Sequence, residues 1–156
     1  MNVAQVVRAR MLQSWQYYQD ELVRVISPLT DAQLGLRLAA NQRTAGELAE
    51  HIVRARALWL PRAFGAGDAT LAALANWDEP EDPPRSAPDI TAGLALTWEW
   101  ILSAIGPSAA DDPAANVTGA ELEKLQIIWG LQEHDVHHGG ELAYTLGAHG
   151  LAVPDV

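Results

Sequence analysis

The sequence contains no cysteine among its 156 residues. Disulfides, thiolate metal sites and cysteine nucleophiles are therefore all excluded, and any thiol chemistry would need the thiol of a small molecule. Basic residues are also scarce, with 10 Lys and Arg against 20 Asp and Glu, which gives a formal net charge of −10. Because no basic cluster is present to bind phosphates, we expect no nucleic-acid partner.

Long apolar runs are missing too. No uninterrupted apolar stretch approaches the ~18 residues that a membrane span requires. The first residues, MNVAQVVRARMLQ, lack the hydrophobic core of an export signal, so we expect a cytoplasmic protein without a membrane partner. A composition of 49% hydrophobic and 19% charged residues is ordinary for a globular protein. The length predicts one domain over residues 1–156.

Strand patterns are weak, whereas apolar residues recur at steps of three and four. This spacing predicts an all-α protein. The expected main helices cover 2–27, 44–64, 89–105 and 118–146, with shorter helical pieces near 30–33 and 69–76. Capping-box patterns begin at Thr30, Thr44 and Thr118. Four main helices with two longer connections indicate a four-helix bundle.

Histidines are concentrated in EHDVHHGGEL, residues 133–142, which holds three of the five in the chain. At 100° per residue, His138 lies about 20° and His134 about 60° from Leu131 around the helix, on its inner side. His51 lies on the inner stripe of the second main helix. We therefore expect three imidazoles from two helices to converge inside the bundle.

A single inward histidine is usually a hydrogen-bonded core residue, but an i,i+4 pair with a third imidazole favours a metal site. Neutral imidazoles suit Zn²⁺, Ni²⁺ or Fe²⁺, and three of them leave coordination positions open for water or substrate. The alternative, in which the three histidines are core residues without a metal, stays open.

Glu141 lies about 20° from His134 around the helix, which makes it a candidate second-shell acceptor, proton shuttle or fourth ligand. We predict it as the residue that transfers protons. His137 is expected to be solvated or to support the site, and His149 to lie on the surface. Asp135 is expected to point away from the inner face into solvent.

Gly139 and Gly140 conflict with the helix, since each costs about 0.5–1 kcal/mol relative to Ala. A second apolar line, which includes Trp129 and Val136, shares a face with Gly140. We hypothesise that Gly140 permits close approach of another element or of a second subunit, and we expect a homodimer. For Gly139 the sequence suggests only room beside the site.

Other catalytic motifs fit poorly. HDVHH resembles the zinc-protease pattern H-E-x-x-H with Asp in place of Glu, but the extended form would need Gly and His where Glu141 and Tyr144 stand. A di-iron bundle needs paired Glu-x-x-His motifs, and of the three inward histidines only His138 has an acid three residues before it.

Two segments, TAGELAEHIVRARALWL and HDVHHGGELAYTLGAHGLAVPD, resemble the DinB/YfiT-like superfamily of four-helix metalloproteins, and the similarity covers nearly the whole chain. The resemblance implies an up-down-down-up bundle with a divalent metal held by His51, His134 and His138. Characterised members of this superfamily include enzymes that use a low-molecular-weight thiol as cosubstrate, so the resemblance implies that this chain could do the same. This chain departs from the commoner HHRGQ ending, since Gly139 replaces the basic residue and Glu141 the glutamine.

Together these observations predict a metal-dependent enzyme acting on a small molecule, as a thiol-dependent transferase or a hydrolase, through metal-bound water or thiolate. The alternative is a non-catalytic small-molecule-binding or stress-related bundle whose metal site is structural or vestigial.

Overall fold

Helices account for all the regular structure in the described part of the chain. The computed structural model describes residues 3–65, 67–77, 83–105 and 119–155, and of 3–5 and 119–125 the backbone alone. The helices are α1 (Val3–Ile26), α2 (Asp31–Leu34), α3 (Ala45–Phe64), α4 (Ala69–Leu74), α5 (Ala87–Ile105) and α6 (Gly119–Ala148). The predicted helices are confirmed, although α5 begins two residues before the expected start and α6 ends two residues beyond the expected end.

The first turn of α3 is fixed by a capping box. The Thr44 hydroxyl accepts a hydrogen bond from the Glu47 amide at 3.1 Å, and the Glu47 carboxylate accepts one from the Thr44 amide at 2.6 Å. Thr30 makes the equivalent arrangement with Gln33 at α2. Two of the predicted capping boxes are therefore confirmed, and the one at Thr118 lies outside the described residues.

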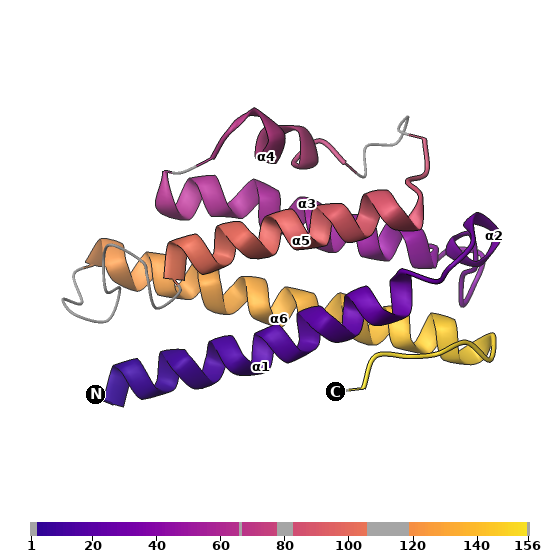
Figure 1. Ribbon diagram of the computed structural model, residues 1–156, viewed down its shortest axis with the longest axis horizontal. Coiled ribbons are helices and arrows are strands. Elements are labelled where there is room, and N and C mark those ends of the chain that lie inside the picture. Colours follow the sequence, from indigo (N-terminus) through magenta and orange to yellow (C-terminus); the bar gives the residue numbers. More distant parts are fainter. Residues whose placement is uncertain (1–2, 66, 78–82, 106–118, 156) are drawn as a thin grey trace.

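The four long helices pack as a bundle in which the first and last run one way and the middle two run the other way (Figure 1). α3 contacts both α5 and α6, and α1 contacts the same two helices. α4 belongs to the connection between α3 and α5 and packs on those two helices. The expected four-helix bundle with up-down-down-up order is confirmed, and it places α3 antiparallel to α6.

The core lies between the four long helices, because each buries one apolar stripe. Along α1 the buried positions recur at helical spacing, as expected for a helix with one apolar face. Residues from α3, α4, α5 and α6 complete the core; the largest fully buried apolar side chains are Trp15, Leu22, Ile26, Ile52, Leu71, Ile90, Leu94, Ile101, Ile105, Ile128 and Leu142.

An ion pair lies inside this core. Asp135 Oδ2 accepts hydrogen bonds from Arg56 Nε at 2.9 Å, from Arg56 Nη2 at 2.7 Å and from Trp15 Nε1 at 2.6 Å. Both members of the pair have fully buried side chains. The expectation that Asp135 is solvated is therefore wrong. Its helical position is about 40° from buried Leu131, and a buried guanidinium requires a carboxylate partner.

The two adjacent glycines of α6 have different surroundings. A β-carbon at Gly139 would overlap the Tyr18 ring and hydroxyl of α1, so α1 and α6 approach closely there. A β-carbon at Gly140 would meet nothing within 4 Å. Within the chain, the close approach expected at Gly140 is thus wrong, and Gly139 makes it instead. That Gly140 permits the close approach of a second subunit stays a prediction.

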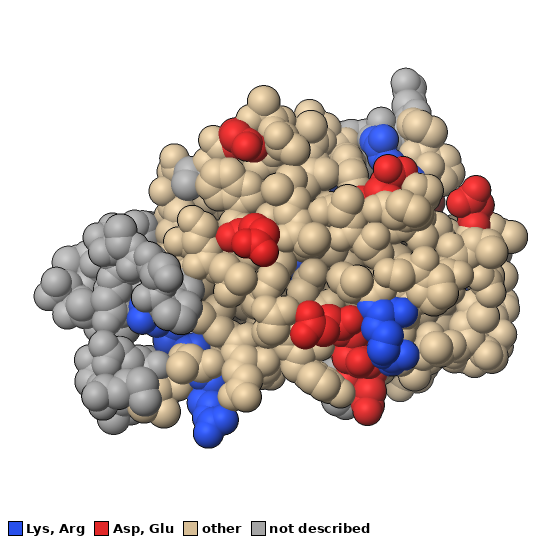
Figure 2. All heavy atoms as spheres, viewed as in Figure 1, with Lys and Arg blue, Asp and Glu red and all other residues tan. Residues whose placement is uncertain are grey.

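The surface facing the viewer in Figure 2 is mostly uncharged, and its acidic and basic side chains are scattered. Among the described residues on this face, basic side chains do not gather into a patch. No helix in the described ranges is both long enough and apolar enough to cross a membrane.

Candidate metal centre

Three histidines meet where α3 and α6 pack side by side. His51 lies in the second turn of α3, and His134 and His138 lie one turn apart on α6. One ring nitrogen from each lies within 4.8 Å of the others, and the Nε2 atoms of His51 and His134 are 3.2 Å apart. The structure therefore brings together the three residues that the sequence predicted to converge.

The three rings form a triangle and meet edge-on or tilted rather than in a parallel stack. Ring centroids are 5.0 Å apart for His51 and His134, 4.6 Å for His51 and His138, and 4.4 Å for His134 and His138. All three residues are half-buried. Nitrogens this close together can share one ion with small rotations of the rings, as a metal ligand set requires.

The environment keeps His134 neutral. Burial, together with the neighbouring His138 and His51, lowers the pKa of His134 from its ordinary 6.5 to about 4. At neutral pH its ring therefore carries a free lone pair, the form that binds a metal ion. Its Nδ1 is buried and has no hydrogen-bond partner among the described atoms.

Glu141 supports the third histidine. Its Oε2 lies 2.7 Å from His138 Nδ1, and its side chain is about half exposed. Because a carboxylate accepts hydrogen bonds, this contact favours the tautomer of His138 with the proton on Nδ1, which leaves Nε2 available as a ligand atom. Glu141 also forms, with His137 and His138, a second group of possible ligand atoms within 4.8 Å of one another, so its role as ligand, acceptor or proton shuttle stays a prediction.

The remaining histidines lie outside the cluster. His137 is exposed; its ring lies 4.7 Å from that of His138, and its Nε2 lies 3.8 Å from Glu141. It therefore borders the site, as expected. His149 is also exposed, and its Nε2 lies 3.2 Å from the carbonyl oxygen of Arg37. This bond ties the end of α6 to the segment before α3.

A hollow of about 500 Å³ opens beside His51 and His138. The loop before α3 contributes Gln42 and Arg43 to its wall, and the last turns of α6 contribute Glu141, Tyr144 and Thr145; Leu38 and Leu48 also line it. The size suits a small molecule. The histidine cluster therefore borders a hollow that is open to the outside, and the wall of this hollow is partly polar.

Sequence reasoning missed the buried polar network in the core, in which Arg56 and Asp135 form the ion pair. Arg56 lies in the apolar stretch of α3 and donates to Gln19 at 2.7 Å as well as to Asp135. The available signal was the charge itself, since an arginine within RARALWL stands on the face that the neighbouring apolar residues bury.

Comparison with known proteins agrees with this architecture. The family model of the DinB superfamily matches residues 15–142. An uncharacterized protein, YrdA of Bacillus subtilis (strain 168), is 25% identical over 148 residues, covering 93% of this chain and 84% of YrdA. The crystal structure of a DinB-like protein from Bacillus cereus ATCC 10987 superposes with a TM-score of 0.69 at 23% identity, over 94% of this chain and 95% of that one.

Proposed function

The chain belongs to the DinB superfamily, and we propose that it is a metal-dependent enzyme that acts on a small molecule, as a thiol-dependent transferase or a hydrolase. The observation that carries this proposal is the cluster of His51, His134 and His138 beside a hollow of small-molecule size. Three imidazoles with an open side are typical of catalytic rather than structural metal sites.

The donor set fits a divalent ion. Three nitrogen ligands suit Zn²⁺ or Ni²⁺ best, with Fe²⁺ as a third choice. Such an ion would supply Lewis-acid chemistry, because it lowers the pKa of a water or thiol that binds to it. Since the chain has no cysteine, the thiol of a transferase reaction would be a low-molecular-weight cosubstrate.

Glu141 is the residue that we propose for proton transfer. One of its carboxylate oxygens bonds to His138 and thereby orients that ring, and the half-exposed side chain reaches the same hollow. A carboxylate at the rim of a binding site is able to accept a proton from an entering group and return it to a product.

The test is elemental analysis of tag-free protein by inductively coupled plasma mass spectrometry. We expect about one equivalent of Zn, Ni or Fe per chain in the wild-type protein and a loss of that metal in His51→Ala and His138→Ala. His149→Ala is the matched control, because it removes an exposed histidine outside the cluster and should keep the metal.

A metal-loaded protein would then be screened for turnover with small thiols and electrophiles, and for hydrolysis, before and after removal of the metal. Turnover that disappears with the metal and in Glu141→Gln would support the enzyme. If folded protein takes up no metal after incubation with each ion, the three histidines are core residues and the proposal is wrong.

A further inference from the structure

A second hollow touches the histidine cluster from the opposite side. It has a volume of about 250 Å³ and is lined by Trp59, Ile127, Gly130, Leu131 and His134. Apart from the histidine, the described residues of this wall are apolar or glycine. The first hollow reaches the cluster at His51 and His138, whereas this one reaches it at His134.

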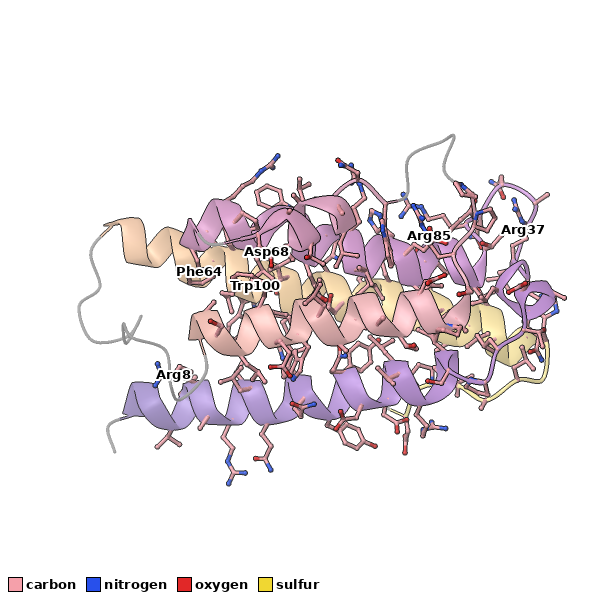
Figure 3. The ribbon with its side chains drawn as sticks, turned by 45° about the horizontal axis from the view of Figure 1, so that its top comes forward. Arg8, Arg37, Phe64, Asp68, Arg85 and Trp100 are labelled. Carbon is pink, nitrogen blue, oxygen red and sulfur yellow. The ribbon has the colours of Figure 1, made fainter. Side chains whose placement is uncertain are left out.

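The two hollows extend in opposite directions along the seam between α3 and α6. Trp59 follows His51 by eight residues, or about 12 Å along the helix axis, whereas Gln42 and Arg43 precede the helix. On the antiparallel α6, Gly130 precedes His134, and Tyr144 follows His138. Figure 3 labels Phe64 near the end of α3 that lies beyond Trp59, and Arg37 toward the opposite end.

From this arrangement, and resting on the proposed function, we infer that the substrate is an elongated small molecule with two unlike ends. Its reactive group lies at the three histidines. An apolar planar or branched group lies against Trp59 and Leu131, and a group that accepts hydrogen bonds, such as a carboxylate, lies toward Gln42 and Arg43.

The sizes of the two hollows support this reading. A cavity of about 150 Å³ lined by apolar side chains suffices to bind benzene, so the smaller hollow has room for an aromatic ring. Trp59 is 42% exposed, and although the Arg62 guanidinium lies 4.9 Å from its ring centroid, the indole still contributes apolar surface to the hollow. Arg43 is the basic residue among those that line the larger hollow, and a guanidinium is suited to carboxylates.

Gly130 gives a direct way to fill the apolar hollow. A β-carbon there would meet nothing within 4 Å, and the position is exposed in the interior of α6. Gly130→Leu should therefore fold and place its side chain where the apolar group of the substrate would lie. Gly130→Ala is the matched control, because it makes the same change in helix propensity while filling little of the space.

The test measures binding of three hydroxamates to zinc-loaded protein by isothermal titration calorimetry. Acetohydroxamate supplies the metal-binding head alone, phenylacetohydroxamate adds a ring, and succinic monohydroxamate adds a carboxylate. We expect the ring to strengthen binding by about tenfold in the wild-type protein, as partial burial of an aromatic ring would give. Gly130→Leu and Trp59→Leu should remove this gain, whereas Gly130→Ala and Trp129→Leu should keep it.

Succinic monohydroxamate should bind the wild-type protein more tightly than acetohydroxamate does. In Arg43→Met this gain should be lost, whereas phenylacetohydroxamate should keep its gain in affinity. Equal affinities for the three probes, or a gain from the ring that survives in Gly130→Leu, would overturn the inference while leaving the metal site intact. Zinc stoichiometry is measured first on the same samples. A protein that binds no zinc would overturn the proposed function and this inference with it.

Discussion

The hydroxyl of Tyr18 on α1 lies against Gly139 of α6, in space that the β-carbon of any other residue would occupy. Tyr18 is buried, and its hydroxyl has no hydrogen-bond partner among the described atoms. The contact therefore depends on shape rather than on a polar bond. It lets the first helix pack closely against the helix that carries two of the three clustered histidines.

This relationship predicts opposite effects for two neighbouring substitutions. Gly139→Ala should lower the free energy of unfolding by about 1–3 kcal/mol, because the new methyl group displaces the Tyr18 ring or separates the helices. Gly140→Ala should raise it by up to about 1 kcal/mol, since the added methyl meets nothing and alanine favours a helix. Urea denaturation of the two variants and the wild type measures both changes.

A second variant separates the Tyr18 contact from other causes. Replacing the ring in Tyr18→Ala should itself be destabilising, but adding Gly139→Ala to it should cost far less than in the wild-type protein. If Gly139→Ala lowers the free energy of unfolding equally in the wild-type and Tyr18→Ala proteins, the Tyr18 ring is not what disfavours a β-carbon at position 139.

The buried pair of Arg56 and Asp135 gives the second prediction. Asp135→Ala should lower the free energy of unfolding by about 3–5 kcal/mol, because the guanidinium would be left buried without its carboxylate. The double variant Arg56→Met with Asp135→Leu should lose much less, since no buried charge would remain. Chemical denaturation of the single and double variants checks this; a double variant as unstable as the single would contradict it.

The fold itself follows closely from local signals. Steps of three and four in α1 and the capping box at Thr44 predicted helices whose bounds agree to within about two residues. His134 and His138 lie together because a spacing of four puts them on one side of a helix, whichever helix it meets. Such features depend on the geometry of one helix alone and are readable from sequence.

Features that depend on how two helices meet were not predictable in this way. Asp135 was assigned to solvent as a residue that points away from the inner face, and only the position of α1 and α3 shows that Trp15 and Arg56 reach it. The close approach was assigned to Gly140, whereas within the chain it is made by Gly139, because only the position of Tyr18 on α1 decides between the two. The hollows likewise combine residues of α6 with α3 and its preceding loop.

Acid should destabilise the metal-free protein through His134. The pKa of this histidine is about 4 in the folded protein because of burial and of the neighbouring His138 and His51, against 6.5 ordinarily. Between these values the unfolded chain binds more protons than the folded one, so stability is lost as the pH falls from 6.5 to 4. The whole difference in pKa would correspond to about 3 kcal/mol, but because the ring is only partly buried and is screened by solvent, we expect His134 to account for about 1–2 kcal/mol of that loss.

Denaturation curves in the presence of a chelator at intervals between pH 7 and 4 measure this effect. His134→Asn should reduce the dependence on pH in that window, whereas His149→Asn, which alters an exposed histidine, should leave it unchanged. A slope that is identical in His134→Asn and in the wild type would assign the loss to other groups.

Glu141 should strengthen metal binding through His138. Glu141→Gln keeps the size of the side chain but removes its charge and weakens the bond to His138 Nδ1, so we expect the dissociation constant for zinc to rise about 10- to 100-fold. Competition with a chromophoric chelator gives the constant. Glu133→Gln is the matched control on the same helix, since Glu133 bonds to exposed Trp129 and should leave zinc affinity unchanged.

The outer face of α6 leads to the last prediction, that the protein is a homodimer. Trp129 and Val136 are 56% and 49% exposed, and with Val7 and Met11 of α1 they line an open hollow of about 710 Å³. Exposed apolar groups that gather on one surface commonly mark an interface between proteins. We propose that a second copy of the chain covers this face.

Multi-angle light scattering of purified protein should therefore give about twice the mass of one chain. Val136→Glu should convert the protein to the monomer, because the dimer would bury a charge without a partner. Gly140→Leu should weaken association too, since Gly140 lies one turn beyond Val136 and has open space beside it within the chain. Val153→Glu introduces the same charge at an exposed apolar residue outside this face and should leave the mass unchanged. A monomeric wild-type protein would contradict the dimer, and a dimeric Val136→Glu variant would place the interface elsewhere.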